Sequence, residues 1–159
     1  SNSVTCDILV ADEINVQKQP ATNAAGAYDG AGSRVFNKVG ASSSPTNPQG
    51  KVFALTGSGA GSWAVADKDA EATSIGLLAV WPNTGGPSKM LAEGTVLMAS
   101  NSGWSTASAG APLYLADDGA VKAAAPGDSG DIVRIVGYVL NAASRIMYFR
   151  PDPTFIKIA

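Results

Sequence analysis

Histidine is absent from this 159-residue sequence, and cysteine occurs once, at Cys6. A serine or cysteine nucleophile therefore has no imidazole base to take its proton, and the usual zinc sites lack their ligands. A single cysteine cannot form an intrachain disulfide, so we expect Cys6 to be a small buried apolar residue. These absences argue against a histidine-dependent hydrolase and against a zinc protein.

Charge is also scarce: 15% of the residues are charged, against roughly 25% in typical soluble domains. The formal net charge is −2, and the 11 basic residues are scattered singly, so no cluster is suited to binding phosphates. No run approaches the ~20 apolar residues of a membrane span, and the first residues do not resemble a secretion signal. We expect neither nucleic acid nor membrane as a partner, and a surface of small polar residues that fits a protein packed against neighbours.

The C-terminal part of the chain is rich in β-branched and aromatic residues, which fit strands better than helices. Three such runs cover residues 130–140, 145–150 and 154–158, and they predict three consecutive strands. The break at 141–144 is short enough for a hairpin, and the first strand is apolar on both faces, which predicts a central position. Its alternation places one set of side chains on a common face: Ile132, Arg134, Val136 and Tyr138.

Short strand patterns separated by turn signals recur along the rest of the chain, which is typical of an all-β fold. They cover residues 4–10, 34–39, 51–55, 62–65, 75–81, 95–98, 112–115 and 120–122. One or two helical turns are predicted within 67–74, with Asp67 as N-cap. We predict a small β-barrel or β-sandwich body over 51–159, preceded over 1–50 by a strand and an extended N-terminal arm or long loop.

The segment 15–50 is of low complexity and poor in large side chains, so it cannot offset its ordering entropy alone. One interpretation is a flexible linker or long loop. The other is an arm that becomes ordered against another subunit or a larger assembly. The second interpretation assigns the contact with a neighbouring protomer or the larger assembly to Tyr28, Val35 and Phe36.

Several short motifs suggest chemistry, but none has the partners that the chemistry needs. The run 127–130 spells Gly-Asp-Ser-Gly, as around the nucleophile of trypsin-like proteases, yet without histidine it is expected to be a turn. The glycine-rich run 57–61 lacks the spacing and the following helix of a dinucleotide site. Asp67, Asp69 and Glu71 alternate, but no twelve-residue calcium loop surrounds them. We predict neither a bound metal nor a cofactor.

Two further groups of residues leave alternatives open. Acid–base chemistry would be possible if carboxylates converged in a cleft, although turn and capping roles also account for them. These carboxylates are Asp117, Asp118, Asp128 and Asp131. Trp63, Trp81 and Trp104 suit either core packing or sugar stacking, and core packing is favoured. We expect a structural or binding protein and not an enzyme.

Four segments, 66–79, 111–115, 130–138 and 146–154, resemble tailed-bacteriophage virion structural proteins. The resemblance is to capsid decoration (cement) proteins and to head or tail fibre modules, and it covers roughly residues 62–158. Similar sequences usually read Asn-Pro-Asp after the Tyr-Phe pair, whereas this chain has Arg150 in place of the asparagine.

The resemblance implies a β-rich, β-tulip-like module that assembles as a homotrimer on the outer surface of a virion, after synthesis in the host cytoplasm. Its partners would be the major capsid protein and further copies of itself, and its role would be to clamp capsid subunits together. The alternative within the same resemblance is a fibre or receptor-binding module that recognises host-surface glycans.

Overall fold

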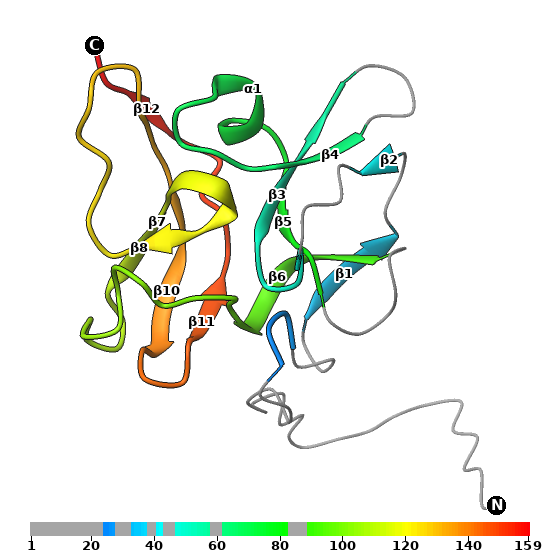
Figure 1. The fold of residues 1–159 in the computed structure, drawn as a ribbon, viewed down its shortest axis with the longest axis vertical. Helices are drawn as coiled ribbons and strands as arrows, with labels where there is room; N and C mark the ends of the chain where they lie inside the picture. Colours follow the sequence, from blue (N-terminus) through cyan, green and yellow to red (C-terminus); the bar gives the residue numbers. More distant parts are fainter. Residues whose placement is uncertain (1–23, 28–32, 38–40, 43–46, 58–61, 83–88) are drawn as a thin grey trace, which may run out of the picture.

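The computed structural model describes residues 24–27, 33–37, 41–42, 47–57, 62–82 and 89–159. It confirms the predicted all-β class. Ten strands form one sheet that curls into a half-barrel, and two more form a small separate sheet (Figure 1). Every pair of neighbouring strands is antiparallel except β2 with β4. Within the described residues, no helix is long and apolar enough to cross a membrane.

The large sheet has the order β2-β4-β3-β5-β6-β11-β10-β7-β8, and β1 also pairs with β6. Its strands are β1 (Arg34–Asn37), β2 (Ala41–Ser42), β3 (Val52–Thr56), β4 (Ser62–Val65), β5 (Leu78–Val80), β6 (Lys89–Leu97), β7 (Pro112–Leu115), β8 (Val121–Lys122), β10 (Ile135–Asn141) and β11 (Ile146–Phe149). The small sheet pairs β9 (Ile132–Val133) with β12 (Ile156–Lys157). One helical turn, α1 (Glu71–Ser74), and a 3₁₀ turn, η2 (Asp117–Gly119), complete the fold.

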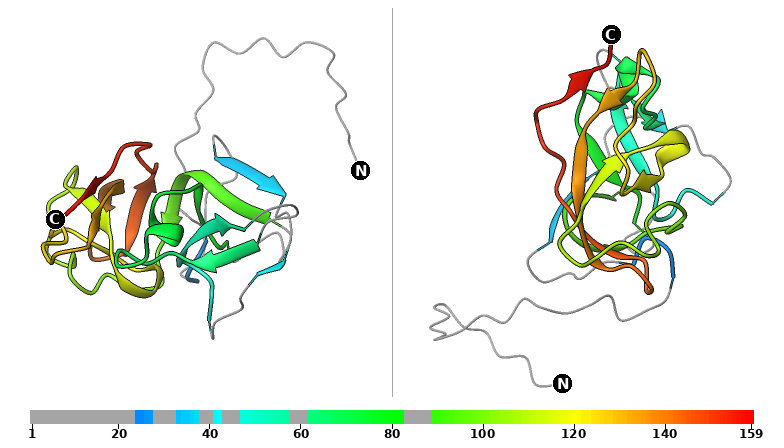
Figure 2. Two further views of the ribbon diagram at one scale, coloured as in Figure 1. Left: turned by 90° about the horizontal axis from the view of Figure 1, so that it is seen from above. Right: turned by 90° about the vertical axis from the view of Figure 1, so that its left-hand side faces the viewer.

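Strand β6 joins the two halves of the sheet. Its residues 89–93 pair with β1 and β5, whereas residues 94–97 pair with β11. Gly94 lies at the change of partner with φ 143°, and a Cβ there would come within 2.5 Å of the Ser33 hydroxyl oxygen. Only glycine fits this conformation and this contact. In Figure 2 the strands from blue to green lie on one side of the molecule and those from yellow to red on the other.

The main core combines buried apolar side chains from both halves of the sheet, including Val52, Leu91, Leu113 and Phe149. Alternation along β3 gives a second cluster on the opposite face. That cluster contains Phe53, Trp63, Ala79, Trp81 and Met90, with the Phe53 and Trp81 ring centroids 5.2 Å apart. Trp104 belongs to the main core. All three tryptophans are buried, as the favoured interpretation predicted.

Part of the N-terminal segment belongs to this sheet. β1 pairs with β6, and the backbone of Gly26 and Ala27 exchanges hydrogen bonds with Leu97 at 2.6 and 2.8 Å. The predicted boundary at residue 50 therefore falls between strands of one sheet. The predicted strand 4–10 and most of the predicted arm lie outside the described residues.

The prediction of one regular strand over 130–140 was wrong in its register. The chain divides at Arg134 into β9 and β10, and the pairing of β10 with β7 shifts between Ile135 and Gly137. This irregularity turns Val136 into the core while Tyr138 faces solvent, so the two do not share a face. The central position of β10, the hairpin at 141–144 and the pairing of the C-terminal strand are confirmed.

The predicted short helix is confirmed as a single turn, but Asp67 is not its N-cap. α1 begins after Ala70, which makes no side-chain cap. The Asp67 carboxylate accepts a hydrogen bond from the backbone N–H of Asp69 at 3.0 Å instead. This local turn delays the start of the helix, because a short carboxylate side chain competes with helical bonding for nearby N–H groups.

Candidate functional site

A pocket of about 420 Å³ lies where the segment before β5, the middle of β6 and the segment after β11 meet. This volume is within the range of small-molecule and peptide-side-chain sites. Its lining combines three arginines and one glutamate with aliphatic residues: Arg34, Ile75, Gly76, Leu77, Leu78, Ala92, Glu93, Arg134, Arg150, Pro151 and Pro153.

Glu93 is the acidic group of the pocket. Its carboxylate accepts hydrogen bonds from the Tyr148 hydroxyl at 2.7 Å and from Arg34 Nη1 at 3.1 Å, and it lies 3.7 Å from Arg150 Nε. The bond from Tyr148, followed by those charges, holds the pKa of Glu93 below its usual range, despite opposing burial. The same bond raises the pKa of Tyr148. Glu93 is therefore ionised at neutral pH and is poorly suited to donate a proton.

Arg134 fastens two walls of the pocket together. Its Nη1 donates to the carbonyls of Ser74 and Gly76 at 2.9 and 2.8 Å, and its Nε donates to the Asp152 carbonyl at 2.7 Å. Burial lowers the pKa of this arginine, which is 5% exposed, but a guanidinium stays protonated in proteins. Its Nη2 makes no hydrogen bond to any other described residue.

The pocket carries positive charge in a chain whose net charge is negative. Three guanidinium groups and one carboxylate line it, whereas the formal charge of the chain is −2. The side chains of Arg34 and Arg150 are 77% and 68% exposed, so most of their N–H donors face solvent. The arrangement is suited to binding an anion beside an aliphatic surface.

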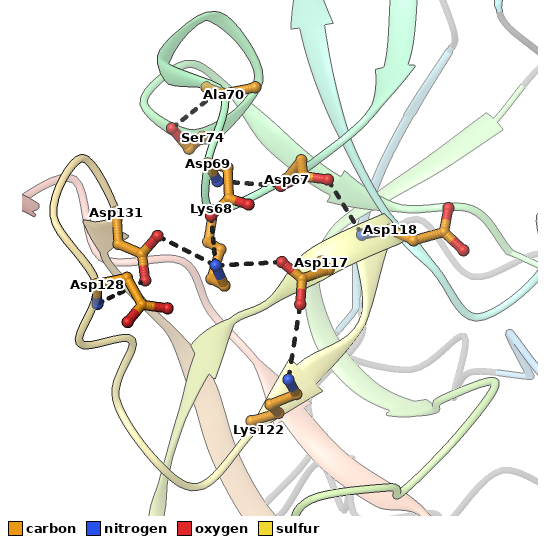
Figure 3. A network of polar contacts seen from close by, with 10 residues as sticks. All are labelled: Asp67, Lys68, Asp69, Ala70, Ser74, Asp117, Asp118, Lys122, Asp128 and Asp131. Carbon is orange, nitrogen blue, oxygen red and sulfur yellow. Dashed lines mark hydrogen bonds and ion pairs between the residues drawn. The ribbon is translucent and has the colours of Figure 1, made fainter.

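A second polar cluster surrounds Lys68 (Figure 3). Its ammonium lies 3.1 Å from Asp131 Oδ1 and 3.3 Å from Asp117 Oδ1, and it also contacts the Asp69 carboxylate. Hydrogen bonds to Asp69 and Asp131 raise the pKa of Lys68. Burial alone would raise the pKa of Asp131, but hydrogen bonds involving Asp69 and Lys68 outweigh it and lower the pKa. The network holds the loop before α1 against η2 and the start of β9.

This network brings together three carboxylates that could hold a cation. One oxygen each from Asp67, Asp69 and Asp117 lies within 4.8 Å of the others. Sequence reasoning had grouped Glu71 with the first two, whereas Glu71 pairs with Lys157 at 2.6 Å. Asp117 was missed as a neighbour because a contact across fifty residues leaves no local signal. The Lys68 ammonium already supplies positive charge to these carboxylates, and the expectation of no bound metal stays a prediction.

Three of the four carboxylates considered for acid–base chemistry form ion pairs, and the fourth residue, Asp128, lies in a turn. Asp117 and Asp131 both contact Lys68, and Asp118 pairs with Lys51. The backbone N–H of Asp128 donates to Asp131 Oδ2 at 3.2 Å, within the predicted turn around 127–130. Asp117, Asp118 and Asp131 thus have ammonium partners, and these structural contacts account for them without catalysis.

The three predicted interface residues fall in or near β1. Val35 is half-buried and packs against the main core. The backbone of Phe36 pairs with Met90 of β6, but its side chain lies outside the described residues, as does the whole of Tyr28. Their role in contacting another protein stays a prediction.

An uncharged row of side chains crosses the outer face of the sheet and was missed from the sequence. Tyr138 of β10 pairs with Pro112 of β7 and with Tyr148 of β11, which in turn pairs with Thr95 of β6. Tyr138 is 41% exposed, and Leu140, two residues along the same face, is 45% exposed. The exposure of Tyr138 and Leu140 was not predicted, because it depends on the register shift in β10 and the sequence pattern does not indicate that shift.

Comparisons with known proteins found no match to this chain among family models, curated proteins or solved structures. A function is therefore argued from the fold, the surfaces and the resemblance of the sequence segments described above.

Proposed function

We propose that this chain is a bacteriophage virion structural protein, a capsid decoration protein that binds the outer capsid surface as a homotrimer and stabilises the shell. The observation that carries the proposal is the resemblance of four segments, three of which form neighbouring strands. Segments 111–115, 130–138 and 146–154 contribute β7, β10 and β11, which lie side by side in the sheet. These three of the four segments thus form one continuous part of the sheet.

Two features of the surface support a role in assembly. The outer face of those strands presents Tyr138 and Leu140 to solvent without a charged residue between them. The chain is poor in charge overall, which suits a protein packed against neighbours. In a trimer, three weak contacts with a capsid would be made together, and effective concentration would multiply their affinity.

The first experiment is the solution mass by light scattering over a range of concentrations. A trimer at every concentration supports the proposal, and a monomer that also fails to co-sediment with capsids of its cognate major capsid protein would contradict it. Co-sedimentation should be repeated after deletion of residues 1–23, which retains β1 and the Gly26–Leu97 contact. Loss of binding with the fold intact would support contact through the N-terminal segment.

A matched pair of double variants tests the outer face. Tyr138→Ser with Leu140→Ser removes the exposed apolar groups of β10, and we expect a lower mass or weaker capsid binding. Phe155→Ser with Ile156→Ser removes similar exposed groups at the small sheet and serves as control. Equal behaviour of the two variants would argue against the β10 face as an interface.

The second candidate, a fibre module that binds host glycans, depends on exposed aromatic rings. All three tryptophans are buried, so among the described residues sugar stacking would have to use other rings, such as those of Tyr138 and Phe155. A glycan array with the intact protein separates the candidates, because specific glycan binding without capsid association would favour the fibre module.

A further inference from the structure

We propose that the pocket between β5, β6 and the segment after β11 binds an acidic peptide segment, in which a glutamate or aspartate side chain is flanked by an apolar residue. The inference rests on the pocket itself and does not depend on the proposed capsid function. No residue of the Lys68 network lines this pocket, so the two polar sites are separate.

The net positive charge of the pocket lining favours a ligand with an acidic group. Glu93 neutralises one of the three arginines of the lining, and a second negative charge from a ligand would still leave the site positive. Arg34 and Arg150 each direct one nitrogen toward Glu93, Nη1 of Arg34 at 3.1 Å and Nε of Arg150 at 3.7 Å, so their other N–H groups can bind a carboxylate. Arg134 lines the same pocket, and its Nη2 is not engaged by the described residues.

The uncharged part of the lining favours a ligand in which an apolar peptide side chain lies next to the carboxylate. Ile75, Leu77, Pro151 and Pro153 supply an aliphatic surface, and none of the described residues that line the pocket is aromatic. Nucleobases bind by stacking on aromatic rings, and a bare inorganic anion would leave the aliphatic surface unused. Leu77 is exposed in the free protein, so covering it with an apolar side chain would remove apolar surface from water.

The walls are fixed before a ligand binds. Arg134 holds the carbonyls of Ser74 and Gly76 on one wall and that of Asp152 on the other. Tyr148 and Arg34 hold Glu93 from two strands. A pocket with its walls held by hydrogen bonds has less conformational entropy to lose on binding.

The test uses two short peptides that differ only in charge, acetyl-Leu-Glu-Leu-amide and acetyl-Leu-Gln-Leu-amide, titrated into the ¹⁵N-labelled intact protein. We expect amide shifts of Gly76, Leu77 and Ala92 with the acidic peptide and about fivefold weaker binding of the neutral one. Equal affinity of the two peptides would overturn the proposal. Inorganic phosphate is titrated in parallel, and phosphate binding as tight as the acidic peptide would also overturn it.

Two charge-removing variants complete the experiment. Arg150→Gln removes an exposed arginine of the pocket, and we expect about fivefold weaker binding of the acidic peptide with little change for the neutral one. Lys89→Gln removes an exposed charge from the same strand as Glu93 but outside the lining, and binding should stay within about twofold. A loss of equal size in both variants would show nonspecific charge attraction and contradict the proposed site. These experiments measure neither capsid binding nor self-association. The peptide-binding proposal and the capsid proposal can therefore fail independently of each other.

Discussion

Gly137 lies in β10 where the neighbouring strand leaves no space for a side chain. A Cβ at this position would meet the Tyr148 carbonyl oxygen at 2.1 Å and the Met147 Cε at 2.5 Å. The carbonyl is part of the β10–β11 pairing and cannot move without disturbing it. We expect Gly137→Ala to lower the free energy of unfolding by about 3 kcal/mol, the upper part of the range for overpacking.

Urea denaturation measures this loss, and Gly127→Ala provides the matched control. Nothing lies within 4 Å of a Cβ built at Gly127, and its backbone is not in the left-handed region. We expect its free energy of unfolding to change by less than about 0.5 kcal/mol. Similar stability of the two variants would contradict the close approach at Gly137.

The Glu93–Tyr148 hydrogen bond predicts a defined pH range of stabilisation. Folding lowers the pKa of Glu93, so its contribution is complete above the ordinary glutamate pKa of about 4.3 and is lost as the pH falls through the folded-state value. Folding raises the pKa of Tyr148, so its contribution is complete below about 10 and is lost as the pH rises through the raised value.

A double-mutant cycle with Glu93→Gln and Tyr148→Phe measures this contact. We expect a coupling of about 1 kcal/mol, since Glu93 is partly exposed to solvent, and the coupling should be constant between about pH 5 and pH 9. It should decrease below and above this range. A coupling that increases below pH 4 would contradict the ionised state of Glu93.

At the scale of elements, Arg134 connects segments that are far apart in the sequence. It lies between β9 and β10, and it donates to the carbonyls of Ser74 at the end of α1, of Gly76 just beyond it, and of Asp152 after β11. Arg134→Leu leaves three carbonyl oxygens without their donor, and we expect a loss of about 3 kcal/mol in the free energy of unfolding.

Arg134→Lys separates the contribution of the positive charge to stability from that of the guanidinium hydrogen bonds. A lysine keeps the positive charge but has a single nitrogen, so it cannot reproduce the fork that reaches Ser74, Gly76 and Asp152 together. We expect it to recover less than half of the lost stability in thermal or urea unfolding. Full recovery would mean that charge alone is required.

The elements show which features a local pattern can predict. Period-two apolar runs correctly placed β3, β4, β7 and β11, and prolines and small polar residues marked the breaks between strands. The pattern over 130–140 failed because the division at Arg134 depends on carbonyl groups from distant segments. The start of β6 at Lys89 was also missed, because its first residues are determined by pairing with β1 and β5.

The candidate pocket could not be predicted from sequence for the same reason. Arg34, Glu93 and Arg150 are far apart along the chain and meet only because β1 and β11 both pair with β6. Each residue alone resembles an ordinary solvated charge. The tryptophans, in contrast, were correctly assigned to the core, since large apolar side chains next to strand patterns are usually buried.

At the scale of the whole molecule, the described residues among the first fifty are part of the body. Deletion of residues 1–50 removes β1, β2 and the hydrogen bonds of Gly26 and Ala27 to Leu97. We expect this deletion to lower the melting temperature markedly and to expose the core beside Val35, with binding of a hydrophobic dye as a second readout.

Deletion of residues 1–23 is the control, because it retains all of those contacts. We expect its melting temperature to stay within a few degrees of the intact chain. If the longer deletion were equally stable, the pairing of β1 with β6 would contribute little to the body, contrary to its place in the sheet.

The shared strand β6 also affects how the protein is made. The second half of β6 pairs with β11, which begins only at Ile146, so a nascent chain cannot form the complete sheet until β11 has been synthesised and has left the ribosome. Pairings between segments far apart in sequence form slowly, and unpaired strand edges stay exposed meanwhile. During synthesis on the ribosome, the apolar residues of β6 would therefore be a binding site for chaperones.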